Sequence, residues 1–195
     1  MRRLTAIMAV NEQGVIGKDN ALPWRIRSDL RFFRRQTVTN IVIMGRNTWH
    51  SLGKCLPDRK NIVVTHDAGL FEEQPACRIA DGVEKALALA ATIGAADDEV
   101  FVIGGAAIYA QFAPYVDRYL ITEVRKPVEN ADSIVSPSLL GAVNDWAIAR
   151  IESGSADEGA GDEADFAIFS LTHRNADTIA RRREAAISAA AERNP

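Results

Sequence analysis

The sequence has little cysteine, no long apolar run and no large excess of charge of either sign. Its two cysteines, Cys55 and Cys77, are too few for a disulfide framework and do not have the spacing of metal ligands. We therefore expect no metal site and a reduced, cytoplasmic setting. No apolar run approaches the length of a membrane span, so we expect no membrane association. The net charge of −3 gives no reason to expect nucleic acid as the main partner.

The chain also lacks an internal repeat, and its first predicted strand is not followed by the Gly-x-Gly-x-x-Gly fingerprint of an ordinary Rossmann domain. Its 195 residues, 47% apolar and 25% charged, are sufficient for one globular domain with a substantial core. We place that domain at residues 1–173, because the composition changes after them to an Ala- and Arg-rich tail with few large apolar residues.

The tail over residues 174–195 is expected to be helical or disordered. An isolated helix of this length is marginal in water, so a frayed or loosely docked helix is the simpler interpretation. The alternative is a basic contact to nucleic acid or to another protein through Arg181-Arg182-Arg183.

Short apolar runs alternate with helical segments along most of the chain. The runs that predict buried strands span residues 4–10, 41–44, 61–65, 100–103 and 119–124. Helical segments are expected after Ser28, from Asp81-Gly82 to Ile93 and over residues 106–112, whereas residues 66–77 are expected to form a loop. This alternation predicts an α/β fold with a mostly parallel sheet covered by helices on both faces.

The C-terminal part of this domain departs from the alternation. Residues 146–151 and 166–172 predict two strands, and the connection between them, SGSADEGAGDEAD, is too polar to be part of a core. Its glycine and acidic residues are typical of a long, exposed hairpin loop.

The stretch from Gly14 to Phe33, GVIGKDNALPWRIRSDLRFF, has an unusual charge pattern. A glycine-punctuated loop leads into a short helix, for which Ser28 is the predicted N-cap. Projected at about 100° per residue, one side of this helix is basic and the other apolar, with Asp29 inside the apolar arc. The basic side consists of Arg31, Arg34 and Arg35, and the apolar side of Leu30, Phe32 and Phe33.

Two interpretations of Asp29 are open at this point. As a residue of the first turn, it can favour the helix dipole and reach solvent. Alternatively, it is the single ionised group of an apolar cleft and faces a ligand that carries hydrogen-bond donors, since a buried carboxylate is costly unless something binds it.

Two predicted strand ends have features that suit phosphate groups. At Gly45-Arg46-Asn47-Thr48 a strand gives way to a helix, whose free N–H groups, together with Arg46 and Thr48, suit an anion. Gly104-Gly105 precedes the helix over residues 106–112 and, without Cβ atoms, lets the backbone approach a pyrophosphate. Each turn alone is weak evidence, but together they suggest a dinucleotide across the carboxyl ends of the strands.

These motifs resemble dihydrofolate reductase in their order and spacing over residues 4–172. They are GVIGKDNALPW, Asp29 with Phe33, IVIMGRNTW, LPDRKNIVVT, VFVIGGAAIY and YLIT. The resemblance implies a single-domain fold with an eight-stranded, mostly parallel sheet and an antiparallel C-terminal hairpin. It implies the reduction of 7,8-dihydrofolate to tetrahydrofolate by NADPH. It further implies a cytoplasmic monomer that binds antifolates such as methotrexate or trimethoprim.

The resemblance also implies roles for residues at the substrate. Asp29 would accept hydrogen bonds from the pterin, supported by Trp24 and Thr122. Arg59 would pair with the α-carboxylate of the substrate. Leu22 would belong to the catalytic residues together with Asp29, Trp24 and Thr122. The walls of the substrate site would be Ala6, Leu30, Phe33, Leu52, Leu56 and Ile103.

A second set of positions matches the cofactor site of the family. Arg46, Thr65 and His66 would lie near the adenosine 2′-phosphate. The pyrophosphate would be cradled by Thr48, Gly104, Gly105 and Ala106. Tyr109 matches a position near the nicotinamide site, and further cofactor-binding positions are Gly45, Asn47, Ala107 and Ile108. The nicotinamide would lie near Ile7 and under a mobile loop that includes Ile16, Asn20, Ala21 and Leu22.

Some positions depart from the family pattern, namely Thr5 and Ile7 beside the nicotinamide, Cys55 at the rim and Ala131-Asp132-Ser133 beside the mobile loop. We interpret Cys55 as a small apolar residue. Two alternatives remain: a pyrimidine reductase of riboflavin synthesis, which has the same fold and cofactor, and a nucleotide-binding relative without catalytic activity. Trp24 with Asp29, together with Phe33 and Arg59, favours folate.

Overall fold

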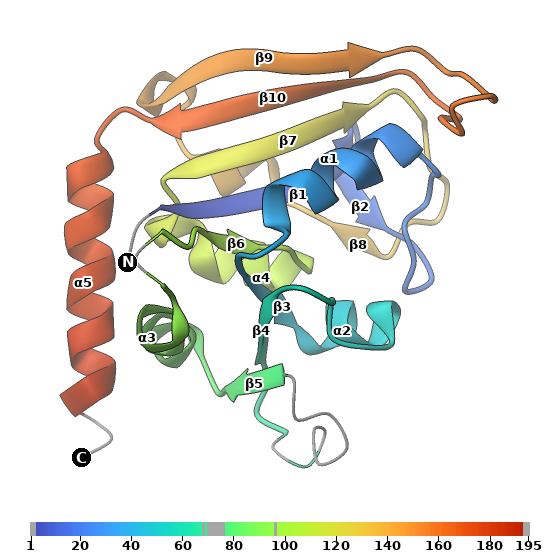
Figure 1. Cartoon of the computed structure of the whole chain (residues 1–195). Helices are drawn as coiled ribbons and strands as arrows, with labels where there is room; N and C mark the ends of the chain where they lie inside the picture. Colours follow the sequence, from blue (N-terminus) through green and yellow to red (C-terminus); the bar gives the residue numbers. More distant parts are fainter. Residues whose placement is uncertain (1–2, 68, 70–76, 96, 193–195) are drawn as a thin grey trace.

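The computed structural model describes residues 3–67, 69, 77–95 and 97–192. Eight strands form one sheet in the order β5-β4-β3-β6-β1-β7-β10-β9, and β2 and β8 form a separate pair (Figure 1). The strands of the main sheet are β1 (Leu4–Asn11), β3 (Ile41–Gly45), β4 (Lys60–Val64), β5 (Cys77–Ala80), β6 (Val100–Val102), β7 (Arg118–Val124), β9 (Trp146–Gly154) and β10 (Phe166–His173).

The pairing within the sheet confirms the predicted fold class. Every neighbouring pair from β5 to β7 is parallel, and β10 is antiparallel to both β7 and β9. The five apolar runs all form strands, and the two C-terminal segments form the expected hairpin. The prediction of a loop over residues 66–77 missed the start of β5 at Cys77, because a four-residue edge strand carries little periodicity.

Side-chain alternation along the strands produces two cores, one on each face of the sheet. In β3, Ile41 and Ile43 join the core that contains Leu87 and Phe112, whereas Val42 and Met44 join the core that contains Phe32. Helices α1 (Arg27–Thr37) and α2 (Arg46–Leu52) therefore cover one face, and α3 (Val83–Ile93) and α4 (Ala106–Phe112) cover the other. The predicted layering is confirmed.

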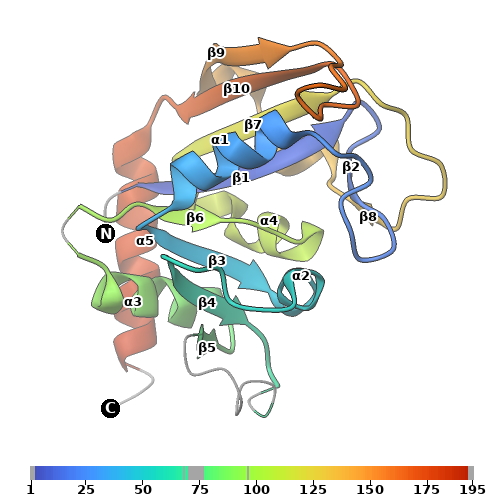
Figure 2. The ribbon, with the colours of Figure 1, turned by 45° about the vertical axis from the view of Figure 1, so that its right-hand side comes forward.

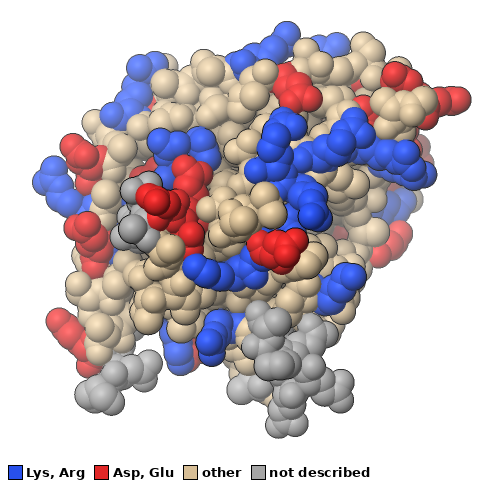
Figure 3. Space-filling view, in the orientation of Figure 1, with Lys and Arg blue, Asp and Glu red and all other residues tan. Residues whose placement is uncertain are grey.

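Helix α1 has the predicted two-sided character but a different cap. Phe32 is buried, while the arginines of the helix are exposed, and Lys and Arg side chains gather over α1 in Figure 3. The prediction that Ser28 is the N-cap is wrong, because the helix begins at Arg27 and Ile26 occupies the cap position. Ser28 instead donates to a carboxylate from the distant hairpin connection.

The tail forms helix α5 (Ala176–Glu192), which packs against α3 and the short η2 helix (Ala113–Tyr115). The expectation of a frayed or loosely docked helix does not hold for these residues, because Arg183 is only 3% exposed. Its Nη1 lies 2.6 Å from Oδ2 of Asp117, and the same carboxylate oxygen accepts the backbone N–H of Leu4 at 2.7 Å. The tail is thus joined to the start of β1.

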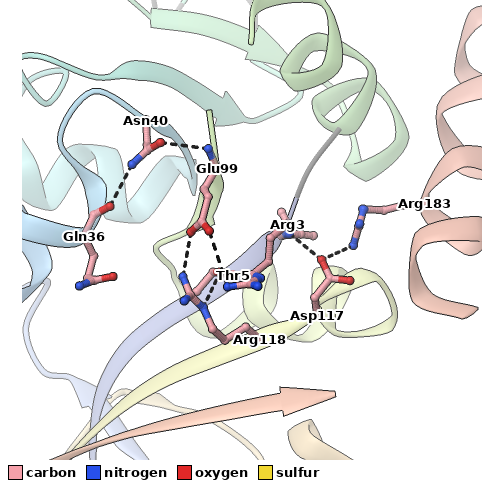
Figure 4. A network of polar contacts seen from close by, with 9 residues as sticks. Arg3, Thr5, Gln36, Asn40, Glu99, Asp117, Arg118 and Arg183 are labelled. Carbon is pink, nitrogen blue, oxygen red and sulfur yellow. Dashed lines mark hydrogen bonds and ion pairs between the residues drawn. The ribbon is translucent and has the colours of Figure 1, made fainter. Parts of the chain in front are cut away.

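Figure 4 shows that this contact belongs to a wider polar network at the amino ends of the central strands. Arg118 donates to Thr5 and to Glu99, at 3.1 and 2.8 Å. The backbone N–H of Glu99 donates to the side-chain oxygen of Asn40 at 3.0 Å. The network therefore connects β1, β7, the start of β6 and the loop after α1.

Cys55 and Cys77 are joined by a disulfide, with 6.1 Å between their Cα atoms. The expectation that they form no disulfide, and that Cys55 is merely a small apolar residue, is therefore wrong. The reason is a long-range pairing, in which Asn61 of β4 lies opposite Cys77 of β5. The side chain of Asn61 also forms hydrogen bonds with both the N–H and the C=O of Leu56. Residue 55 is thereby brought beside β5.

The remaining short elements are β2 (Val15–Gly17), β8 (Ser133–Ile134), η3 (Pro137–Leu140) and η4 (Val143–Asp145). Within the described part of the chain, no helix combines the length and the apolar character needed to cross a membrane.

Candidate active site

A cleft of about 1290 Å³ lies at the carboxyl ends of the central strands. It receives residues from the ends of β1, β3 and β4, from the turn after β6, from the first turns of α1, α2 and α4, and from the loop that follows β1. Asp29, Gly104 and Gly105 all line it. The carboxylate and the two glycines, which are far apart in sequence, therefore share one concave site.

Asp29 lies in the first turn of α1 and is half-buried. Its Oδ1 accepts a hydrogen bond of 2.6 Å from the hydroxyl of Thr122, which is a buried residue of β7. Burial raises the pKa of the Asp29 carboxyl above its ordinary value, the Thr122 hydrogen bond opposes this rise, and the negative charge of Asp162 adds to it. The interpretation of Asp29 as a solvated first-turn residue is thus excluded.

Helix α4 contributes a buried phenol, Tyr109, to the lining of the cleft. The Oη of Tyr109 donates to the backbone oxygen of Ile7 at 2.7 Å. Burial raises the pKa of Tyr109, and the charge of Asp29 raises it further. Tyr109 therefore acts as a fixed neutral donor that holds α4 against β1.

Apolar side chains remain exposed at the mouth of the cleft. Leu22, Leu30 and Leu52 are 51%, 46% and 38% exposed, although all three line the site. Exposed leucines that surround a cleft are typical of a surface that an apolar ligand covers. Phe33 and Ile103 line the same region and are only partly buried.

The two glycine turns meet in space. The N–H of Gly45 donates to the oxygen of Gly104 at 2.8 Å, so the turn before α2 abuts the turn before α4. Gly104 has a φ of +123°, which favours glycine, and a Cβ at Gly45 would lie 2.7 Å from Cγ1 of Ile108. The hydroxyl of Thr48 faces both Gly104 and Gly105. A larger residue at Gly45 or Gly104 would therefore clash or be strained.

The loop after β1 is attached beside the cleft. Strands β2 and β8 pair, the N–H of Asp19 donates to Oδ2 of Asp132 at 2.9 Å, and Nζ of Lys18 donates to the oxygen of Glu129. Despite its departure from the family pattern, the segment around Asp132 thus contacts the loop that Ile16, Asn20, Ala21 and Leu22 bring into the site.

Most of the residues predicted for the site line the cleft. They are Ile7, Ile16, Asn20, Ala21, Leu22, Asp29, Leu30, Phe33, Gly45, Arg46, Asn47, Thr48, Leu52, Thr65, His66, Ile103, Gly104, Gly105, Ala106, Ala107, Ile108 and Tyr109. Thr122 reaches it through Asp29.

Besides Thr122, four predicted residues do not line the cleft. Ala6 is buried in the core, one residue before the part of β1 that reaches the site. Trp24 is also buried, and its Nε1 has no hydrogen-bond partner among the described residues. Leu56 is partly buried against the core that contains Phe32. Arg59 lies beside Phe33, with its guanidinium 5.9 Å from the centre of the Phe33 ring. Its Nε and Nη1 donate to Thr37 and to the oxygen of Pro57.

Sequence reasoning missed other residues of the site. The cleft is also lined by Met8, Ala9, Gly17, Lys18, Ser51, Val64, Asp67, Asp132, Ser133 and Ile134. Met8 and Ala9 could have been found, because they continue β1 toward its carboxyl end. Asp162 carries no local signal, since its contact to α1 spans 134 positions.

Comparison with known proteins agrees with this geometry. A family model described as dihydrofolate reductase matches residues 3–171. The dihydrofolate reductase of Staphylococcus haemolyticus is 35% identical over 159 residues, which are 80% of this chain and 88% of that protein. The Bacillus subtilis (strain 168) enzyme of the same name is 34% identical over 155 residues, 80% of this chain and 86% of that protein.

A similar solved structure is that of dihydrofolate reductase from Enterococcus faecalis complexed with NADP(H) and RAB-propyl. It is 26% identical, with a TM-score of 0.75, and the match covers 88% of this chain and 96% of that one. The matched family model spans all residues of the cleft, whereas α5 lies beyond its end. On this agreement of sequence, fold and site, the chain belongs to the dihydrofolate reductase family.

Proposed function

We propose that the protein reduces 7,8-dihydrofolate to 5,6,7,8-tetrahydrofolate with NADPH. The observation that carries the proposal is the single cleft in which a half-buried carboxylate, Asp29, lies together with the Gly104-Gly105 turn. A carboxylate among apolar walls suits a flat heterocycle with N–H donors, and the glycine turns suit a dinucleotide beside it.

The substrate end of the cleft is assigned to Asp29 and its supports. The ionised carboxylate accepts hydrogen bonds from the ring N–H and the 2-amino group of the pterin, and Thr122 fixes its orientation. Trp24 supports this region with its buried indole N–H. Leu30, Phe33, Leu52 and Ile103 wall the ring, and Leu56 extends the wall outward.

The charged end of the substrate is assigned to Arg59. Two of its nitrogens are held by Thr37 and Pro57, which fixes the guanidinium beside Phe33. A fixed guanidinium is suited to a bidentate pair with the α-carboxylate of the substrate. Its position beside Phe33 supports a ligand that extends from Asp29 past the aromatic wall.

The cofactor end is assigned to the glycine turns and the strand ends beside them. Thr48, Gly104 and Gly105 present backbone N–H groups and a hydroxyl to the pyrophosphate beside Gly45, while Arg46, Thr65 and His66 lie toward the 2′-phosphate. NADPH, when bound, supplies the hydride that C6 of the pterin receives. The protein contributes by stacking the two rings and by excluding water beneath the loop at Leu22.

The proton that N5 gains comes from water in this proposal. Asp29 has no proton donor role there: its negative charge makes the pterin ring more basic, and a dry site strengthens that effect. Its raised pKa follows from the same withdrawal from water. Orientation and electrostatics are thus the contribution of Asp29.

The proposal is tested by following NADPH oxidation with purified protein and dihydrofolate. We expect turnover with dihydrofolate and none with the ribosyl-aminopyrimidine of riboflavin synthesis. Turnover of the aminopyrimidine alone would assign the alternative reductase, and NADPH binding without turnover of either compound would assign a non-catalytic relative. Asp29→Asn serves as the matched control, since it keeps the size of the side chain.

We further propose that the protein is a cytoplasmic monomer that binds antifolates such as methotrexate or trimethoprim. The Enterococcus faecalis protein in complex with RAB-propyl supports the binding of a second ligand beside the dinucleotide. Thermal shift with each antifolate and size-exclusion chromatography test these points. The cytoplasmic location is tested by thiol titration of the protein isolated from cytoplasm, because the Cys55–Cys77 disulfide is unusual for a reducing compartment.

A further inference from the structure

The connection between β9 and β10 does not extend freely into solvent. The N–H of Glu163 donates to the oxygen of Arg25 at 3.1 Å, the N–H of Arg25 donates to the Glu163 carboxylate at 2.7 Å, and the N–H of Arg27 donates to the oxygen of Gly161. Figure 2 shows this hairpin bending toward the amino end of α1. The connection is thus attached to the residues that directly precede Asp29 in the chain.

Asp162 lies at the centre of this attachment and is only 4% exposed. Its Oδ1 accepts the backbone N–H of Ser28 at 2.9 Å, and its Oδ2 accepts the Ser28 hydroxyl at 2.5 Å. The hydroxyl in turn accepts a hydrogen bond of 2.8 Å from Arg31. Because Ile26 at the cap position has no side-chain acceptor, Asp162 supplies from a distance the carboxylate that a local cap normally provides.

We propose that Asp162 is a positioning residue for the reaction, because it holds the first turn of α1 and with it the carboxylate of Asp29. The inference rests on the proposed function, in which Asp29 orients the pterin. Ser28 is the residue directly before Asp29, so a shift of its backbone moves the carboxylate relative to Thr122 and the glycine turns. Displacements of this kind are costly in catalysis even when they are small.

The charge of Asp162 acts on Asp29 as well. Although burial opposes it, hydrogen bonds from Ser28 and the charge of Arg31 lower the pKa of Asp162, so that this carboxyl is ionised at neutral pH. Its negative charge is one cause of the raised pKa of Asp29, whereas the Thr122 hydroxyl acts in the opposite direction. Tyr109, the other titratable group that Asp29 affects across the cleft, is neutral.

Asp162→Asn and Asp162→Ala separate the two effects. The Asn variant keeps the shape and removes the charge, so the pKa of Asp29 in the ligand-free protein should fall, as measured by carboxyl ¹³C NMR with Asp29→Asn for assignment. The Ala variant removes both hydrogen bonds to Ser28. We expect kcat/KM for dihydrofolate to fall by about ten- to a hundred-fold, with KM for NADPH unchanged.

Two further variants act as controls. Glu158→Gln removes the same charge from the same connection, at an exposed side chain that makes no hydrogen bond or ion pair within the described chain, and should change neither quantity. Ser28→Ala removes the hydroxyl donor but keeps the charge of Asp162, so the pKa of Asp29 should not fall. If Asp162→Ala does not fold, Asp162→Asn and Ser28→Ala still decide the question.

An unchanged pKa of Asp29 in Asp162→Asn, or kcat/KM for dihydrofolate that is unchanged in Asp162→Ala, would overturn the positioning role. An equal fall of the Asp29 pKa in Asp162→Asn and Glu158→Gln would do so too, because it would reflect overall charge. Failure of the proposed function is distinguishable: the wild-type protein would then not oxidise NADPH with dihydrofolate, while the NMR titration would still report whether Asp162 acts on Asp29.

Discussion

At the scale of single residues, Asp29 is placed where the fold does not favour it. Its carboxylate lies half-buried among apolar neighbours and receives one hydrogen bond, from Thr122, within the described structure. The raised pKa records the cost, since the ionised form is less favourable here than in water. A residue that costs stability and faces a ligand cleft is expected to be retained for function.

Asp29→Asn separates the cost of the carboxylate in stability from its role in the reaction. We expect kcat to fall roughly 100-fold at neutral pH, the order found when a preorganised electrostatic group is removed. The melting temperature should not fall, because the amide has no charge to desolvate and can still accept from Thr122. Steady-state kinetics and thermal denaturation of the same preparation measure both; a variant as active as the wild type would exclude the proposed role of Asp29.

The stability difference between wild type and Asp29→Asn should depend on pH. Because the folded-state pKa of Asp29 lies above its ordinary value of 3.8, the native state binds this proton more tightly than the unfolded state. The contribution of the group to stability is therefore most favourable below pH 3.8 and is lost as the pH rises through the folded-state pKa. Urea denaturation at several pH values tests this, and an advantage of the variant that grew toward acid pH would contradict it.

Thr122→Val removes the hydroxyl that orients Asp29 and keeps the branched shape needed in β7. We expect kcat/KM for dihydrofolate to fall by about tenfold. A short hydrogen bond to a charged group contributes on the order of 1–3 kcal/mol, and this variant loses one. Thr122→Ser is the matched control, since it retains the donor. If both variants lose the same activity, packing rather than the hydroxyl is responsible.

At the scale of elements, the docking of helix α5 includes a buried ion pair between Arg183 and Asp117. Arg183→Ala leaves the carboxylate of Asp117 buried without its cation, and we expect the free energy of unfolding to fall by about 3 kcal/mol. Arg181→Ala, at an exposed position of the same helix, should change it by less than about 0.5 kcal/mol. Denaturant titration of both variants gives the comparison, and equal stabilities would mean that the ion pair does not stabilise the docking of α5.

The Cys55–Cys77 disulfide joins the loop before β4 to the edge strand β5, with a sequence separation of 22. Its removal in a Cys55→Ser, Cys77→Ala variant should lower the free energy of unfolding by about 3 kcal/mol under oxidising conditions. Titration of free thiols in the denatured, unreduced wild type should find none. Two titratable thiols, together with unchanged stability of the variant, would contradict the pairing.

At the scale of the whole molecule, the sequence predicts the sheet and the centre of the site. Apolar runs identify the inner strands because those strands are buried on both faces, and the position of Asp29 within an apolar arc identifies the cleft. Strands β2, β5 and β8 are too short to show a period. The disulfide, the docking of Arg183 and the contact of Asp162 to Ser28 depend on long-range pairing, which no local pattern reports.

Ligands that bridge the cleft should stabilise the whole molecule. NADPH at about a hundredfold excess over its Kd should add about 2.7 kcal/mol to the free energy of unfolding, and methotrexate should add to that shift. Thermal denaturation with each ligand and with both measures the effect. NADPH should still stabilise Asp29→Asn, whereas methotrexate should stabilise it less; an equal response of that variant to methotrexate would place the antifolate elsewhere.

The link between α5 and the start of β1 has a consequence for biosynthesis. Asp117 accepts the first amide of β1, yet its countercharge, Arg183, lies 66 positions further along the chain. A nascent chain that ends at residue 173 would have to enclose this carboxylate without a cation. During synthesis, Asp117 therefore gains its buried partner only after α5 has left the ribosome.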